Sequence, residues 1–249
     1  MRTLAEEQRD NLNGYLKAKK EGWEYADFFS ECDDVVIYGF GDIGRLLYHE
    51  LKNKRNVVCA LDISATNERF YSLPVLSPYS EEAREMLKKH PSAKVIVTPT
   101  LHFDEIKHLL NSMSSQIVVY PFCVVTAFLE IRHCLPKDKQ DMLLKLIVGG
   151  VGDVKNVVLV NSMYSLLIYM LYCDSFKNTI VFTHSFDVSK ALASYIEEAG
   201  GTWLPIGGCA KGGFYDVNEL SETVRAIKYY CKENDVNVFS QDFFEVLKL

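Results

Sequence analysis

The chain has 249 residues and a formal net charge of -6. This acidic balance argues against a nucleic-acid partner, which usually requires a basic face. The first residues are polar and charged without an apolar signal segment, and the seven cysteines form no C-x-x-C pair. We therefore expect a cytoplasmic protein with reduced thiols.

Strands and helices are predicted to alternate in the first part of the chain. Residues 4–31 have an amphipathic helical pattern that breaks near Gly22, and residues 64–78 are loop-like apart from the apolar piece 73–76. The apolar segments expected to form strands are 35–38, 57–61, 94–97 and 117–120, and helices are expected over 81–89 and 104–112. Such alternation requires crossover connections and predicts a parallel sheet.

A second alternating pattern follows a helical region at 122–148, which Pro136 divides, and a glycine-rich linker at 149–153. Its predicted strands are 157–160, 179–182, 202–206 and 236–239, and its predicted helices are 164–173, 188–199, 217–233 and a last one from 243. The most apolar stretch, 157–173, is interrupted by Asn161 and Ser162, so we interpret it as a buried strand and helix rather than a transmembrane segment.

The predicted fold is therefore α/β, with a Rossmann-type parallel sheet domain followed by a second, smaller Rossmann-like α/β domain. The expected divisions are an N-terminal helical segment at 1–32, a nucleotide-binding domain at 33–148 and the second domain at 149–249.

One turn of the first domain has the pattern of a phosphate site. The strand ending at Tyr38 runs directly into a G-x-G-x-x-G segment, and a helix pattern follows. In such a turn the first glycine permits the tight bend, the second lets a pyrophosphate approach the backbone, and the third lets the helix pack on the strand. The helix N-terminus adds free N–H groups and a positive dipole end. The predicted cofactor-binding residues are Gly39, Phe40, Gly41, Asp42, Ile43 and Gly44.

Asp62 ends the next apolar strand, where a carboxylate can accept hydrogen bonds from a ribose 2′-OH. A carboxylate repels a 2′-phosphate, so Asp62 favours NAD over NADP. Another reading is a Rossmann-like unit that keeps its glycine turn for packing alone.

Residues 33–125 resemble the NAD(P)-binding Rossmann domain of sugar-modifying proteins, in particular the Gfo/Idh/MocA oxidoreductases. The residues that carry this resemblance are the glycine turn, Asp62 and the run Val95-Ile96-Val97-Thr98-Pro99-Thr100-Leu101-His102. The resemblance implies that Thr98, Pro99 and Thr100 lie beside the nicotinamide side of the cofactor. The same pattern is similar to small Rossmann modules attached to bacterial glycan-assembly enzymes.

The catalytic lysine of that oxidoreductase family has no counterpart here. The family carries it in a Glu-Lys-Pro motif, whereas the corresponding stretch of this chain is Val118-Val119-Tyr120-Pro121-Phe122-Cys123. Hydride transfer would then lack its proton-transfer partner, so a working dehydrogenase is disfavoured.

Residues 155–249 resemble the beginning of bacterial lipooligosaccharide sialyltransferases and related capsule glycosyltransferases. Two segments carry this resemblance, Asn156 to Leu167 and Val236 to Asp242. These enzymes also need a second nucleotide-sugar domain and an Asp-Asp-Gly motif, which the chain does not reach. The resemblance therefore implies the first part of a transferase fold, not catalytic on its own.

Weaker candidates lie at predicted strand ends of the second domain, where ligands of open α/β sheets gather. They are the substrate-binding candidates Asn161, Ser162 and His184. The glycine-rich loop 207–213 lacks the Gly-Lys-Ser/Thr ending of a P-loop and is interpreted as a plain connection. His102 and His108 are six residues apart and would face different sides of a helix, so no metal site is expected.

Three functions remain open: a nucleotide-binding or regulatory module of bacterial surface-polysaccharide synthesis, a glycosyltransferase that uses a nucleotide sugar, and a structural partner subunit. The expected small-molecule partner is NAD or another nucleotide. A homo-oligomer or a glycan-synthesis partner protein is the expected macromolecular one, and an apolar patch between Tyr164 and Tyr172 would be the pairing surface.

Overall fold

The computed structural model describes residues 22–66, 68–99, 101–134, 137–148, 152–160, 162–173, 175–183, 188–205 and 221–240. These residues fall into two compact units, one up to Leu129 and one from Glu130 onward. The change of unit lies within helix α5, Phe122–Cys134, further toward the N-terminus than the linker at 149–153 that the sequence suggested.

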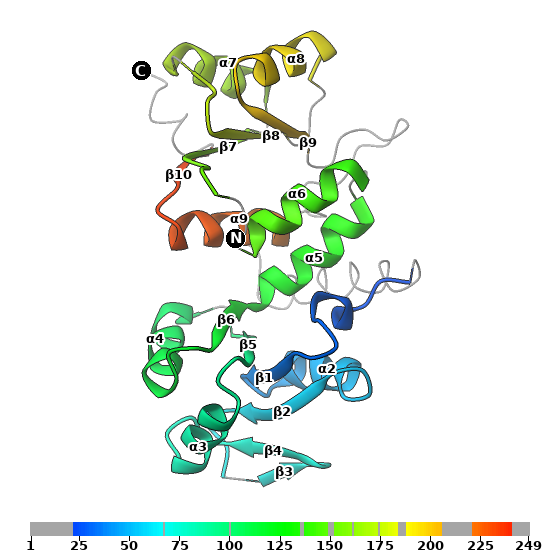
Figure 1. Ribbon diagram of the computed structural model, residues 1–249, viewed down its shortest axis with the longest axis vertical. Coiled ribbons are helices and arrows are strands. Elements are labelled where there is room, and N and C mark those ends of the chain that lie inside the picture. The colour runs from blue at the N-terminus through cyan, green and yellow to red at the C-terminus, as the bar shows by residue number, and fades with distance from the viewer. Residues whose placement is uncertain are drawn as a thin grey trace. The chain divides into compact units, whose positions relative to one another are not determined.

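The first unit is built on a six-stranded sheet with the order β3-β4-β2-β1-β5-β6 (Figure 1). Its parallel strands are β1 Asp34–Tyr38, β2 Asn56–Leu61, β4 Leu73–Leu76, β5 Lys94–Val97 and β6 Val118–Pro121. The short edge strand β3, Glu68–Phe70, pairs antiparallel with β4. Without that edge, the order is the one expected of a Rossmann-type sheet, with the strand order reversing between β1 and β5.

Crossover helices of this unit are α2 Asp42–Leu51, α3 Glu81–Lys89 and α4 Phe103–Met113. The 3-10 helix η1 Tyr25–Phe28 precedes β1, and α5 begins directly after β6. Helix α3 begins at Glu81 as predicted, and Ser80 caps it, because the Ser80 hydroxyl accepts the N–H of Ala83 at 3.2 Å. Residues 23–31, expected to be part of an amphipathic helix, form only the single turn of η1.

An apolar core holds the strands of the first unit against its helices. Val36, Cys59, Leu61, Val95 and Val97 are buried against inward residues of α3 and α4. Strands covered on both faces by helices are apolar at nearly every position, and the strands β1 and β5 have this pattern. This core fixes the carboxyl ends of the parallel strands at one edge of the sheet.

The second unit has a four-stranded, fully parallel sheet with the order β10-β7-β8-β9. The strands are β7 Asn156–Val160, β8 Thr179–Thr183, β9 Thr202–Pro205 and β10 Asn237–Phe239, and the helices are α6 Lys137–Ile147, α7 Met163–Tyr172, α8 Lys190–Glu198 and α9 Ser221–Glu233. The predicted α/β architecture of both halves is confirmed, and α5 and α6 lie on either side of residues 135–136, as the break at Pro136 predicted.

The second sheet has the same reversal of strand order as the first. Its first strand, β7, lies between the second strand β8 and the last strand β10. The carboxyl ends of β7 and β10 therefore lie at the position where open α/β sheets bind ligands.

Candidate functional site

The glycine turn follows β1 at the point where the strand order of the first sheet reverses. Gly39 has a φ of +87°, and a Cβ there would lie 2.6 Å from Cδ of Pro99. A Cβ on Gly44 would lie 2.2 Å from the carbonyl oxygen of Gly39. Both positions therefore exclude any side chain, for the two packing reasons that the sequence pattern predicted.

Gly41 differs from its two neighbours, because no atom lies within 4 Å of the position that its Cβ would occupy. Gly41 is the N-cap of α2, and its φ of -73° is one that other residues adopt. Asp42 follows as an exposed first-turn acid, and Ile43 is partly buried. The open side of the turn therefore lies at the positive end of the α2 dipole, where an anion is stabilised.

Phe40 contributes to this turn in two ways. Its side chain is buried and packs edge-on against Tyr48 at 6.2 Å and Phe70 at 5.2 Å between ring centroids. Its backbone N–H donates a 2.6 Å hydrogen bond to Oδ2 of Asp62. The turn and the end of β2 are thus joined by a direct bond between two predicted site residues.

Asp62 is held in place from both carboxylate oxygens. Oδ1 accepts the backbone N–H of Ser64 at 2.9 Å and the Ser64 hydroxyl at 2.6 Å. Burial opposes the charge, but the hydrogen bonds from Ser64 and Phe40 and the charge of Arg45 lower the pKa of Asp62 below its ordinary value. Asp62 therefore stays ionised. Because a carboxylate offers about four acceptor positions, it keeps acceptor capacity for a ligand hydroxyl.

Thr98 and Pro99 lie against the turn from the end of β5. The Thr98 hydroxyl is buried and donates to the carbonyl oxygen of Gly39 at 2.8 Å. Pro99 contacts the same glycine. Thr98 and Pro99 thus pack and hydrogen-bond against Gly39, between the ends of β1 and β5. Thr100 lies outside the described residues.

Three large apolar side chains stand exposed after three parallel strands of this sheet. They are Ile63 after β2, Tyr79 after β4 and Leu101 after β5, each about 70% exposed. Burial raises the pKa of the Tyr38 phenol, and the nearby Tyr79 and Asp62 raise it further. Tyr79 and Asp62 are thus both within electrostatic range of the Tyr38 phenol at the end of β1.

The predicted residues of the second unit can be placed only in part. Asn161 and His184 lie outside the described residues. Ser162 follows β7 as the N-cap of α7, and its hydroxyl accepts the Ser165 N–H at 3.2 Å. Thr183 ends β8, buried, and its hydroxyl accepts the Trp203 indole N–H at 3.0 Å. Both hydroxyls are engaged in the fold of this unit.

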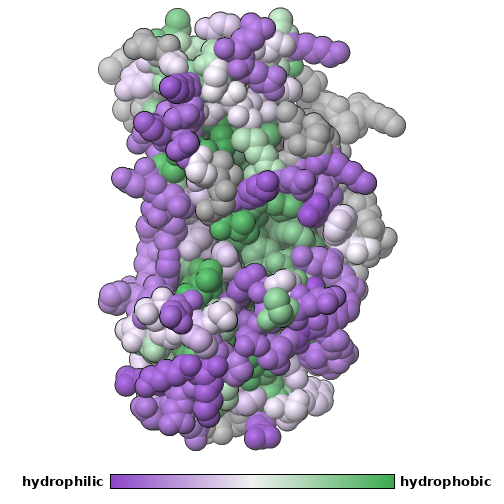
Figure 2. Space-filling model, viewed as in Figure 1, coloured by the Kyte–Doolittle hydropathy of each residue, from purple (hydrophilic) through white to green (hydrophobic). Residues whose placement is uncertain are grey.

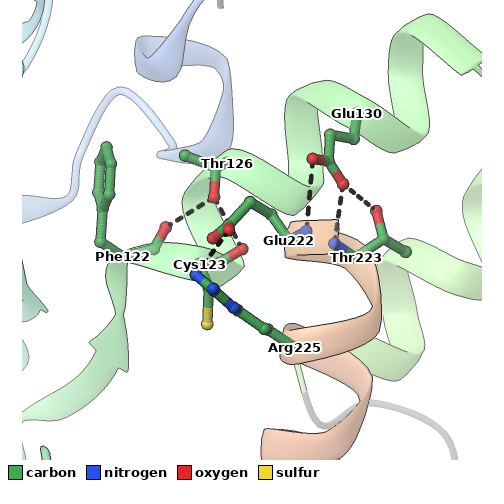
Figure 3. Close-up of polar contacts among 7 residues, drawn as sticks. All are labelled: Phe122, Cys123, Thr126, Glu130, Glu222, Thr223 and Arg225. Carbon is green, nitrogen blue, oxygen red and sulfur yellow. Dashed lines mark hydrogen bonds and ion pairs between the residues drawn. The ribbon is translucent and has the colours of Figure 1, made fainter. Parts of the chain in front are cut away.

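A half-buried carboxyl group that the sequence analysis did not identify lies at the start of α9 (Figure 3). Oε2 of Glu130, on α5, accepts the backbone N–H of Thr223 at 2.8 Å and its hydroxyl at 2.7 Å. Oε1 accepts the N–H of Glu222 at 3.4 Å. Glu222 is itself buried and pairs with Arg225 at 2.9 Å. Glu130 thus caps the N-terminus of α9 from another helix.

Burial raises the pKa of Glu130 to about 8, although hydrogen bonds from Thr223 favour its charged form. The neighbouring Glu222 carboxylate acts in the same direction as burial. In the sequence, Glu130 is marked only as a single acid within the apolar helix 122–134. Its hydrogen-bond partner Thr223 lies more than ninety residues away, so no local pattern connects the two.

No three His, Cys, Asp or Glu side chains of the described residues come together as metal ligands. Five cysteines in the described ranges are free thiols: Cys32, Cys59, Cys123, Cys173 and Cys231. In the part of the chain that the structure describes, no helix combines the length and apolar character needed to cross a membrane. In comparisons with known proteins, no family model matches the chain and no curated protein matches it.

Proposed function

We propose that this protein binds a nucleotide, with NAD as the first candidate, at the glycine turn Gly39–Gly44 and Asp62. In this role it acts as a binding component of bacterial surface-polysaccharide synthesis rather than as a catalyst on its own. The resemblances of the two halves to glycan-assembly proteins support the biological setting. The geometry of the turn supports the ligand.

The observation that carries the proposal is the contrast among the three glycines. Gly39 and Gly44 are required by contacts inside the protein, whereas Gly41 has open space beside it. A turn kept for packing alone would not need glycine at that position, since its backbone angles suit other residues. Close approach of a ligand to the backbone gives a reason for the missing side chain.

The charges around the turn support a dinucleotide that has a free ribose hydroxyl. The N-terminus of α2 offers N–H groups to a diphosphate, and the ionised Asp62 lies one hydrogen bond away from the same turn. A 2′-phosphate would bring two negative groups together. We therefore expect NAD to bind more tightly than NADP.

A Gly41→Val variant tests the proposal, because its side chain would fill the open space while the backbone conformation is retained. The matched control is Gly152→Val, since Gly152 also has nothing within 4 Å of its Cβ position but lies in the second unit. Thermal unfolding is measured with NAD, NADP, UDP-sugars and CMP-sugars. Ligand at a hundred times its Kd stabilises the folded state by about 2.7 kcal/mol, a shift of several degrees.

We expect NAD to raise the unfolding temperature of the wild type and of Gly152→Val, and to leave Gly41→Val unchanged. Equal shifts in all three proteins would exclude the glycine turn as the site. A shift with CMP-sugars alone that survives Gly41→Val would move the ligand to the second unit and favour the transferase interpretation. No shift with any nucleotide would favour the structural partner.

A further inference from the structure

Helix α7 is the most apolar helix of the second unit, and it has no charged residue. Its sequence is MYSLLIYMLY. The inner side supplies Leu166 and Tyr169 to the core, where both are fully buried. Tyr169 packs against Phe176 and Phe239. These inward contacts pack α7 against its sheet.

The outer side of α7 is also apolar, although it faces solvent. Tyr164 is 55% exposed, Leu167 47%, Leu171 85% and Tyr172 58%. These positions follow the i, i+3, i+7 spacing that places residues on one side of a helix. We call Tyr164, Leu167, Leu171 and Tyr172 the outer α7 face.

Among the helices that the structure describes, α3, α4 and α8 do not expose such a face. The exposed positions of α3 are Glu, Arg and Lys, and the space-filling view shows mostly hydrophilic side chains over α3 and α4 (Figure 2). In the second unit, α8 exposes Lys190, Glu197 and Glu198. A helix that is hydrophobic all round is normally buried, so the outer α7 face indicates an interaction surface.

The absence of charge on α7 limits the kinds of partner that the outer α7 face can bind. Helices that lie on a membrane surface carry Lys and Arg on their polar face, and α7 has neither. A strongly charged partner surface would find no complementary group there. A second α7 meets these conditions, because a two-fold axis brings the same patch against itself without repulsion between like charges.

The size of the face fits a weak dimer. Tyrosine side chains bury about 150–250 Å² each, so the exposed parts of the two tyrosines and two leucines together offer about 500 Å² per copy. Two copies would bury about 1,000 Å², which is near the lower limit for a specific interface. The association should therefore depend on protein concentration.

We propose that the outer α7 face pairs with the α7 helix of a second copy of this chain, across a two-fold axis. This inference does not depend on nucleotide binding at the glycine turn. It rests on the apolar outer side of α7, on its lack of charge and on the area that it exposes.

Sedimentation velocity over a range of concentrations tests the dimer. Leu171→Glu places a charge at the most exposed position of the face, where the core is not disturbed. Leu101→Glu is the matched control, because Leu101 is 73% exposed in the first unit. Circular dichroism and thermal unfolding establish that both variants are folded.

We expect the wild type and Leu101→Glu to dimerise equally as concentration rises, and Leu171→Glu to need at least about a hundredfold higher concentration, since each buried unpaired charge costs several kcal/mol. A wild type that stays monomeric at its highest workable concentration would overturn the proposal. The same holds if Leu171→Glu dimerises like the wild type, or if wild-type monomers bind neutral lipid vesicles instead.

Discussion

Three glycines share one turn of the first unit, and the structure gives them different reasons to be glycine. Gly39 and Gly44 leave no room for a Cβ, while Gly41 has open space. The spacing of these residues in the sequence predicted the turn, because Gly39 and Gly44 each have a steric reason to be glycine. The sequence could not show that Asp62 is already bonded to the N–H of Phe40, since that bond depends on the register between β1 and β2.

The charge of Asp62 should decide between NAD and NADP. Replacing it in Asp62→Asn removes the negative charge while an oxygen remains to accept the Phe40 N–H. Two unit charges at about 4 Å interact by about 1 kcal/mol in water and about 4 kcal/mol near a protein surface. We expect the ratio of NADP to NAD affinity, measured by titration calorimetry, to rise about tenfold or more.

Asp42→Asn provides the control for this comparison, because Asp42 is an exposed carboxylate on the same turn. Loss of the Asp42 charge should strengthen the binding of both dinucleotides alike and leave the ratio of their affinities unchanged. If Asp62→Asn also leaves the ratio unchanged, the carboxylate does not face the ribose.

The elements of the fold were largely predictable from hydrophobic patterning, with failures where patterning is weak. Strands β1, β2 and β5 are largely apolar runs, as expected of parallel strands that helices cover on both faces. Strand β3 was missed, because a three-residue edge strand beginning with Glu and Arg has no apolar period. The contact of α5 with α9 was also missed, because tertiary packing creates it and no local signal marks it.

The Glu130 cap should make the stability of the second unit depend on pH. The pKa of Glu130 is about 8 in the folded chain, above its ordinary value of 4.5. Between these values the folded chain holds a proton that the unfolded chain has released, so the free energy of unfolding falls as pH rises. This contribution is fully present below the lower value and is lost through about pH 8.

Urea unfolding of the wild type and of Glu130→Gln, followed across this pH range, measures the effect. We expect Glu130→Gln to flatten the decline, because glutamine does not titrate and its amide oxygen can still accept the Thr223 N–H. Glu198→Gln, an exposed change in the same unit, should keep the wild-type slope. An unchanged slope in Glu130→Gln would show that this carboxyl does not titrate in that range.

At the scale of the whole molecule, a mostly parallel sheet and a fully parallel one, with the same reversal of strand order, follow one another in a single chain. Each has its own core, one centred on β1 and β5 and the other on β7, β8 and α7. The alternating sequence pattern predicted an α/β architecture for both halves. The boundary between the two compact units lies inside α5. It could not be predicted, because the helical pattern is continuous there and only the tertiary contacts of α5 assign its two ends to different units.

Separate cores imply that a ligand of one unit should stabilise that unit first. The two tryptophans of the chain make this measurable, since Trp23 belongs to the first unit and Trp203 to the second. The variants Trp203→Phe and Trp23→Phe each leave one fluorescent reporter. Because a ligand stabilises only the folded state that binds it, we expect NAD to raise the unfolding temperature reported by Trp23 by several degrees and to leave that reported by Trp203 unchanged. Equal shifts at both reporters would mean that the two units unfold as one cooperative body, whereas a shift at Trp203 alone would place the nucleotide in the second unit.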